Sequence, residues 1–195
     1  MAPDYPGYGH SSMPGVNEFD YTFDNLADVM DKFIQELGVK QYSLYVMDYG
    51  APVGFRIAVK HPERVQSLIV QNGNAYDEGL LDFWKPFRAY WNDRSDANAT
   101  VMKNSLLTID ATHWQYTNGV QNVKMINPDN WLVDQTLMDR PGNKDIQLRS
   151  FIPTVRIRLY IQSGRNIFAN INRRCSSCGA RMITFSSGGC ISVSP

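Results

Sequence analysis

The sequence has no long apolar run and no excess of charge of either sign. Lys plus Arg and Asp plus Glu both number 19, so the formal net charge is zero, and no basic run suggests a nucleic-acid surface. No apolar stretch is long enough to span a bilayer, and Met1 is followed closely by Pro3, Asp4 and Pro6, which is unlike a signal peptide. We therefore expect a cytoplasmic protein with no nucleic-acid partner, no membrane partner and no cofactor.

Cysteine is scarce and confined to one end of the chain. Its three residues are Cys175, Cys178 and Cys190, and the first two have the CxxC spacing of a zinc knuckle. Tetrahedral zinc needs four ligands, and no histidine lies nearby. A redox CxxC needs a preceding strand and a following helix, which the local pattern does not predict. Neither a metal site nor a redox site is favoured.

A strand, a sharp turn and a helix follow one another in the first third of the chain. Residues 41–47 (QYSLYVM) are rich in β-branched and aromatic residues, as in a buried strand. Residues 51–61 have a helical pattern, and Pro52 is tolerated in a first turn, where the backbone N–H has no partner. Gly50 suits a tight turn between the two. Asp48 therefore lies at the apex of a strand-to-helix turn.

Two interpretations of Asp48 follow from this position. A residue at such an apex is held in a strained conformation that directs its side chain out of the sheet, as a nucleophile requires. The helix dipole would keep the carboxyl ionised and able to attack carbon. Alternatively, Asp48 is simply the N-cap of the helix, since Asp is common there. The spacing alone leaves both open.

The sequence around this turn resembles a known family. Residues 2–11 (APDYPGYGHS) are similar to the APDxPGxGxS segment of α/β-hydrolases, and residues 61–70 (HPERVQSLIV) are similar to their HPERVxxLxL passage from helix to strand. No GxSxG motif occurs, which excludes a serine-type esterase of this family. With Asp48 at the apex, the chain resembles the epoxide hydrolase and haloalkane dehalogenase branch. The resemblance extends from Ala2 to about Leu148.

The resemblance implies an α/β fold, in which a partial hydrolase core of parallel strands with flanking helices carries a helical cap. We expect the core and its nucleophile turn at residues 1–76 and the cap at 77–148, followed by a tail at 149–195 that does not resemble the family. The local patterns agree. Residues 24–37 predict an amphipathic helix ended by Gly38, and residues 65–71 a second buried strand ended by a turn.

The resemblance also assigns candidate site residues for a small apolar substrate. Asp48 would be the nucleophile, and the backbone N–H of Tyr49 one oxyanion donor. In the cap, Tyr90 and Tyr116 would donate to an epoxide oxygen, whereas Trp84 or Trp91 would bind a halide. Packing is the competing interpretation of all four rings, because aromatic stripes commonly bury large areas. Haloalkane dehalogenases place Trp directly after the nucleophile, so Tyr49 favours the epoxide hydrolase branch.

Several parts of the family's machinery are absent from the sequence. The chain has 195 residues, whereas lidded α/β-hydrolases need roughly 250 to 300, more than one ordinary domain. The HGxP loop with the second oxyanion donor would precede residue 2. Triad His and acid follow the cap in the family, but His10, His61 and His113 come earlier, and no acid follows Asp145. We expect a chain that attacks once without turnover, or a non-catalytic truncated fragment or cap-derived binding module.

The tail from Arg149 to Pro195 has a different composition. It contains Arg and all the cysteines, but no Lys, Asp or Glu. One interpretation is an irregular or disordered tail. Another is a frameshift, because codons for Arg174–Ser186 can be read in a second frame as VLVVWGKNDYIF, which resembles the family's acid-bearing strand. Because the third base of most codons is degenerate, such a match can arise by coincidence. The segments that match in another frame occur in the same order as in the family, however, which favours a frameshift near Leu148 and a second near Ser186.

Overall fold

The structure is a computed structural model that describes residues 1–73, 82–151, 181–185 and 191–193. Its contacts divide the chain into two compact units, one formed by Met1–Thr22 with Asp82–Ile152 and the other by Phe23–Leu81 with Pro153–Pro195. We call these the cap unit and the core unit. The expected α/β class and the alternation of strands with helices are confirmed. The N-terminal segment, expected in the core, is grouped by its contacts with the cap helices.

The core unit begins with the elements that the sequence predicts, within one residue at most ends. They are α1 (Phe23–Glu36), β1 (Tyr42–Met47), α2 (Gly50–Lys60) and β2 (Val65–Gln71). Gly38 follows α1 with a φ of 66°, a conformation that glycine adopts without the clash that a Cβ would cause. Two short strands complete the unit, β3 (Arg181–Phe185) and β4 (Ile191–Val193).

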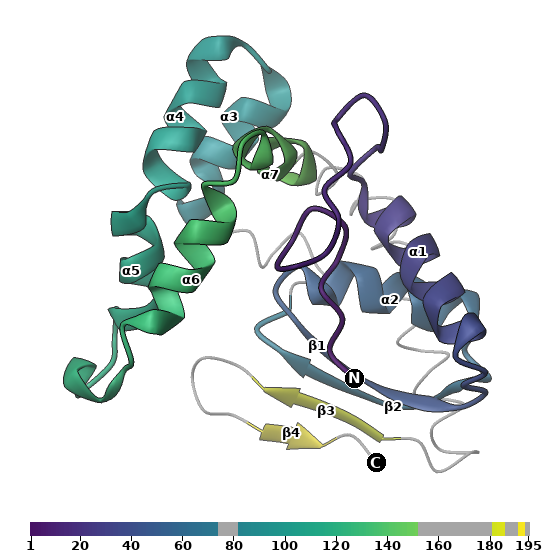
Figure 1. Ribbon diagram of the computed structural model, residues 1–195. Coiled ribbons are helices and arrows are strands. Elements are labelled where there is room, and N and C mark those ends of the chain that lie inside the picture. The colour runs from purple at the N-terminus through teal and green to yellow at the C-terminus, as the bar shows by residue number, and fades with distance from the viewer. Residues whose placement is uncertain (74–81, 152–180, 186–190, 194–195) are drawn as a thin grey trace. The chain divides into compact units, whose positions relative to one another are not determined.

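The four strands form one sheet in the order β1-β2-β3-β4 (Figure 1). β1, β2 and β3 are parallel, and β4 is antiparallel to β3. Helix α2 makes the crossover from β1 to β2, as a parallel pair requires. Since the carboxyl end of β1 leads directly into α2, this topology places Asp48 at the carboxyl edge of the sheet, where α/β folds bind ligands.

Helices α1 and α2 lie on the same side of the sheet (Figure 1). Val46 and Leu68 point toward them and form a buried cluster with Ala51 and Val70. The alternate residues of β1 face the other way, and among them Tyr45 is 59% and Met47 50% exposed. One face of β1 is therefore packed as in a protein core, and the opposite face carries exposed apolar side chains.

Gly54 allows α2 to lie against β1. A Cβ built at Gly54 would be 2.4 Å from Cγ1 of the buried Val46. We expect Gly54→Ala to destabilise the core unit by about 1–3 kcal/mol through overpacking, although alanine favours a helix by about 1 kcal/mol over glycine. Denaturant unfolding will measure this loss. The double variant Gly54→Ala/Val46→Ala should regain part of it, and an unchanged midpoint in Gly54→Ala would contradict the tight contact.

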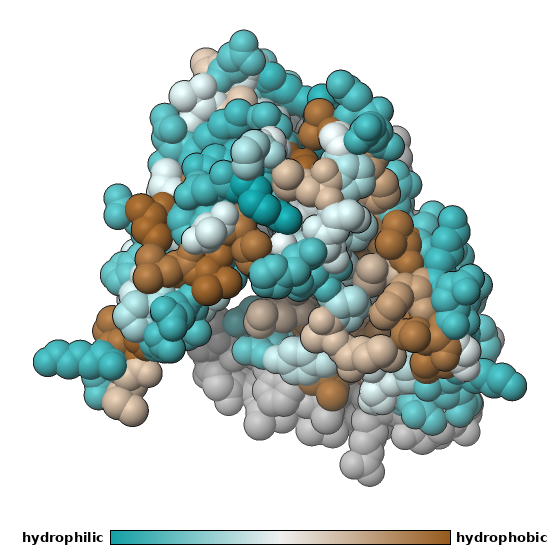
Figure 2. Space-filling model, viewed as in Figure 1, coloured by the Kyte–Doolittle hydropathy of each residue, from teal (hydrophilic) through white to brown (hydrophobic). Residues whose placement is uncertain are grey.

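The cap unit is helical, as expected for residues 77–148. Its elements are η2 (Asp82–Trp84), α3 (Lys85–Asn92), α4 (Asp96–Leu106), α5 (Ile109–Thr117), η3 (Val123–Met125), α6 (Asp129–Met138) and α7 (Asn143–Phe151). Ser95 and Thr108 cap α4 and α5 by accepting hydrogen bonds from backbone N–H groups of the first turns. Apolar side chains also gather on the surface over α5 and α6 (Figure 2). Exposed large apolar residues of these two helices include Trp114, Leu132 and Val133.

The glycine-rich N-terminal segment is held by α7. The buried side chain of Asn143 donates to the carbonyl of Gly7 at 2.7 Å. Gly7 has a φ of 84°, and a Cβ there would lie 2.7 Å from the Tyr21 ring and 2.9 Å from Ile146. Only glycine fits this approach. Residues 2–11 are thus a structural part of the cap unit.

Two strands of the sheet come from the tail. Within 149–195, the structure describes the end of α7 and the strands β3 and β4. Cys175, Cys178, Cys190 and most of the proposed out-of-frame segment lie outside the described residues. Among the residues that are described, no helix is long and apolar enough to cross a membrane.

Candidate active site

Asp48 occupies a strained turn between β1 and α2. Its φ is 46°, in the left-handed region that few residues other than glycine adopt. The turn closes through a hydrogen bond of 3.0 Å from the Ala51 N–H to the Asp48 carbonyl. Gly73, at the end of β2, approaches the same helix start so closely that a Cβ would lie 2.6 Å from Cβ of Ala51. The strand, the strained turn and the helix thus follow one another in the order that the sequence predicts; we call this turn the elbow.

The Asp48 side chain does not serve as a helix cap. The N-cap of α2 is Tyr49, and no side-chain hydrogen bond caps this helix. Instead, the backbone N–H of Tyr49 donates to the Asp48 carboxyl. If Asp48 only capped α2, its carboxylate would accept a hydrogen bond from the second or third backbone N–H of that helix. That hydrogen bond is not formed.

Two opposing effects act on the acidity of Asp48. Desolvation raises the pKa of its carboxyl, and the hydrogen bond from the Tyr49 N–H lowers it, with a net pKa above the ordinary value. The residue as a whole is nevertheless exposed, so water also reaches it. The helix dipole alone predicts an acidic carboxyl, whereas desolvation acts in the opposite direction.

The Tyr49 ring packs into the core unit. It contacts Phe23 of α1 edge to face, with ring centroids 5.3 Å apart. The Arg56 guanidinium lies over the Phe23 ring, 5.7 Å from its centroid. Tyr49 therefore presents its backbone N–H to Asp48, while its ring stabilises the pair of helices.

The two candidate tryptophans of the cap lie together. Trp84 and Trp91 are half-buried, with ring centroids 6.1 Å apart. Phe87 contacts both, at 4.7 Å from Trp84 and 6.4 Å from Trp91. Mutual packing accounts for this cluster without a ligand, which was the competing interpretation of these rings.

The two candidate tyrosines lie on different helices of the cap unit. Tyr90, on α3, is buried. Tyr116, on α5, donates its hydroxyl to Asp134 of α6. Desolvation and this hydrogen bond raise the pKa of Tyr116 to about 12. A phenol whose proton is already held by a carboxylate is a poorer proton donor, so Tyr90 is the better candidate of the two.

The three histidines have other contacts. His10 is exposed in the glycine-rich segment, where its backbone N–H donates to Asp4, and His113 contacts Trp131 in the cap unit. His61 directly follows α2, and its Nε2 lies 3.0 Å from Oδ2 of Asp31. The length of α2 separates His61 from the elbow by roughly 16 Å at 1.5 Å per residue. His61 is therefore not positioned to activate water at Asp48.

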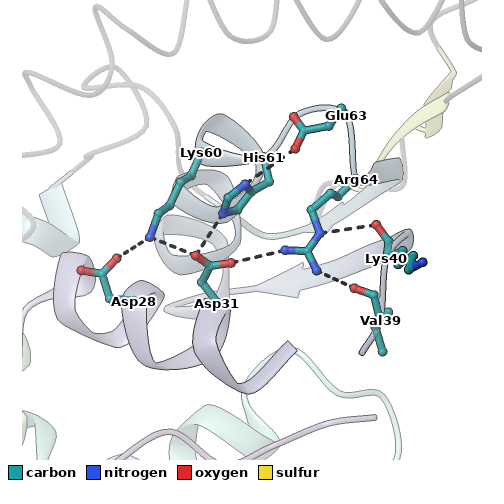
Figure 3. A network of polar contacts seen from close by, with 8 residues as sticks. All are labelled: Asp28, Asp31, Val39, Lys40, Lys60, His61, Glu63 and Arg64. Atoms are coloured by element: carbon teal, nitrogen blue, oxygen red, sulfur yellow. Dashed lines mark hydrogen bonds and ion pairs between the residues drawn. The ribbon is translucent and has the colours of Figure 1, made fainter. Parts of the chain in front are cut away.

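A row of ion pairs that sequence reasoning missed joins α1 to α2. Asp24 bonds to Arg56 at 2.8 Å, and Asp28 and Asp31 bond to Lys60 at 3.0 and 2.9 Å. Asp31 is the centre of the network in Figure 3, with an exposed fraction of only 2%. The sequence contains a signal for this row. The three aspartates are spaced so that they share one face of α1, and the two basic residues of α2 are one helical turn apart.

The Asp31 network predicts a loss of stability in acid. Burial raises the pKa of Asp31, but hydrogen bonds from Lys60, Gln35 and His61 outweigh it and hold the pKa at about 2, below the ordinary 3.8. At 1.36 kcal/mol per pKa unit, the lowered pKa corresponds to about 2 kcal/mol of the free energy of unfolding. This contribution is fully present above pH 4 and is lost as the pH falls toward 2. Unfolding titrations at pH 2 to 5 will test this, with Asp31→Asn as the variant in which that loss should be smaller.

The sequence and the fold are similar to those of known proteins. Residues 1–101 match the family model described as alpha/beta hydrolase fold. An uncharacterized hydrolase of Saccharomyces cerevisiae is 38% identical over 156 residues, which are 77% of this chain and 52% of the yeast protein. A haloalkane dehalogenase of Mycobacterium tuberculosis is 36% identical over 95 residues, 46% of this chain and 31% of that protein. The chain thus spans about half the length of the yeast relative.

Solved structures show the same fold at lower identity. A candidate epoxide hydrolase from Pseudomonas aeruginosa superimposes with a TM-score of 0.65 at 18% identity, covering 84% of this chain and 56% of that one. An ancestral haloalkane dehalogenase gives a TM-score of 0.65 at 17% identity, covering 95% and 72%. These matches support a partial version of this fold, in which nearly half of the first structure has no counterpart.

Proposed function

The chain belongs to the α/β-hydrolase fold family, and on that premise we propose that Asp48 is a nucleophile that forms an ester with a carbon atom of a small apolar substrate. The observation that carries this proposal is the left-handed φ of 46° at Asp48, between a parallel strand and the helix that follows it. A strained conformation persists only where the surrounding structure enforces it, and such residues cluster at active sites.

The chemistry follows from the two oxygens of the Asp48 carboxylate. One oxygen attacks the carbon and forms the ester bond, while the carbon–oxygen bond of an epoxide or the carbon–halogen bond of an alkyl halide breaks. The opened epoxide takes a proton from a phenol or from water, whereas a halide leaves as an anion. The other oxygen becomes the ester carbonyl, and the Tyr49 N–H that already donates to the carboxyl can hold it.

Of the two substrate classes, the site favours an epoxide. A departing halide needs a donor beside the nucleophile, and the Tyr49 side chain is turned toward Phe23. An opened epoxide instead needs a proton donor, a role for which we propose Tyr90 ahead of Tyr116. For the alkyl halide alternative, Trp84 or Trp91 stays the proposed donor to the halide.

We propose that this chain stops at the ester. Hydrolysis requires a water molecule activated by a base, and His61 is occupied by Asp31 at the far end of α2. Neither a second histidine in the core unit's sequence nor an acid after Asp145 is available to complete a triad. A single attack without release would leave the substrate attached to the protein.

The alternative is a non-catalytic fragment or cap-derived binding module, which the exposed apolar residues of α5 and α6 support. The two functions differ in a measurable product. For the proposed nucleophile, intact-mass spectrometry should show the added mass of one whole epoxide after incubation with a small aliphatic epoxide, and of one alkyl group without its halogen after incubation with an alkyl halide, and peptide mapping should place either adduct on Asp48. Absence of any adduct from a folded chain would favour the inert module.

A further inference from the structure

The buried side chain of Arg56 joins the beginnings of two helices in the core unit. Its Nε atom donates to Oδ1 of Asp24 at 2.8 Å, and its Nη1 atom donates to the carbonyl of Pro52 at 2.9 Å. Its guanidinium lies over the ring of Phe23. Phe23 and Asp24 are the first two residues of α1, and Pro52 lies in the first turn of α2. One side chain therefore ties the start of α1 to the start of α2.

Phe23 connects this tie to the elbow. Its buried ring contacts the Tyr49 ring edge to face, with centroids 5.3 Å apart. Tyr49 directly follows Asp48 and has helical dihedral angles, with a φ of −63° and a ψ of −21°. A packed ring restrains the backbone of its own residue. The peptide group that joins Asp48 to Tyr49, whose N–H donates to the Asp48 carboxyl, is therefore restrained as well.

The strain at Asp48 requires restraints of this kind. A left-handed φ of 46° persists only where the surrounding structure enforces it. The hydrogen bond from the Ala51 N–H to the Asp48 carbonyl acts on the helix side of the turn. The contact between Tyr49 and Phe23 acts from α1, and the position of Phe23 depends in turn on Arg56.

We propose that Arg56 is a positioning residue for the Asp48 nucleophile, an inference that rests on the proposed function. Through its contact with Phe23 it keeps Tyr49 in place, so that the Tyr49 N–H stays directed at the carboxyl on which the ester forms. Arginine suits this role, because the planar guanidinium bonds in two directions at its edge while its face stacks on a ring. The ammonium group of a lysine keeps the charge but cannot reproduce this arrangement.

Arg56→Lys tests the inference because it separates the contacts from the charge. Labelling of the full chain by an epoxide should become about tenfold slower, since a misplacement of about 1 Å can cost as much as a hundredfold in rate. Phe23→Leu should slow labelling similarly. The double variant should be little slower than either single variant, because both changes interrupt the same series of contacts.

The matched control is Lys60→Arg, the reverse exchange about one turn further along α2. Lys60 pairs with Asp28 and Asp31 of α1, so this variant should label at the wild-type rate. Circular dichroism and denaturant unfolding of each variant establish that the chains compared are folded.

A spectroscopic measurement distinguishes failure of this inference from failure of the proposed function. In an NMR titration of the full chain, the amide proton of Tyr49 should shift as Asp48 ionises, because the two groups are hydrogen-bonded. In Arg56→Lys this shift should shrink by about half or more, since hydrogen bonds weaken steeply when they are misaligned. Lys60→Arg should leave it unchanged, and a merely structural role of Arg56 would lower stability without affecting it.

The possible outcomes separate cleanly. A smaller amide shift in Arg56→Lys, in a chain whose wild type is not labelled, would refute the nucleophile and leave the positioning role of Arg56 standing. An unchanged amide shift in folded Arg56→Lys would overturn the inference. So would labelling of this variant at the rate of a reactive wild-type chain.

Discussion

Asp48→Asn will abolish covalent labelling of the chain by an epoxide. The wild-type chain should gain one substrate mass, and the variant should label at less than about a thousandth of that rate, because a neutral amide oxygen is a weak nucleophile. Asparagine is the appropriate substitution, since it has the same shape and tolerates the left-handed conformation that Asp48 adopts at a φ of 46°. Intact-mass spectrometry over time measures the rate, and peptide mapping locates the adduct.

The matched control is Asp28→Asn, an exposed aspartate of the same unit that bonds to Lys60. It should label at the wild-type rate. Labelling of Asp48→Asn at that rate, or an adduct mapped elsewhere, would contradict the assignment of the nucleophile. Circular dichroism of each variant separates this outcome from a failure to fold.

The pH dependence of labelling distinguishes the elbow from an ordinary surface carboxylate. Only the ionised carboxyl attacks, so the rate should rise with pH and reach a plateau above the pKa of Asp48. Desolvation raises this pKa above its ordinary value, which moves the midpoint to higher pH than that of an exposed aspartate. A midpoint at or below the ordinary value would show that the Asp48 carboxyl is not desolvated.

Asp31→Ala will cause the largest loss of stability among substitutions of the charged row between α1 and α2. Removing one partner from a buried ion pair costs about 3–5 kcal/mol. We expect the lower end, about 3 kcal/mol, because Lys60, His61 and Arg64 keep some contact with water. Chemical denaturation of the full chain measures the difference.

Asp28→Ala is the matched control for this prediction. Asp28 lies on the same helix and bonds to the same lysine, but its side chain is 60% exposed. Exposed pairs contribute little, so this substitution should cost less than about 1 kcal/mol. Replacing Asp by Ala raises helix propensity by the same amount at both positions, so this effect cancels when the two variants are compared. Equal losses in the two variants would show that the burial of Asp31 is not what stabilises the pair.

Local sequence patterns predicted the core elements and the elbow. Three signals depend only on neighbours along the chain: the aromatic and aliphatic residues before Met47, Gly50 with Pro52 in the next turn, and the amphipathic spacing after Asp24. These signals are local, so one sequence suffices to find a strand, a turn and a helix in order. The position of Asp48 between them followed from the same pattern.

The tertiary structure decided what lies beside each residue. The buried Asp31 network, the desolvation of Asp48 and the contact of the glycine-rich segment with α7 depend on residues far apart in the sequence. The same holds for Tyr116, whose hydroxyl is taken by Asp134 across two helices. The sequence determined which chemical groups the elbow presents. Packing between distant segments decided their burial, partners and acidity, because electrostatic effects depend on distance in space and on access to water.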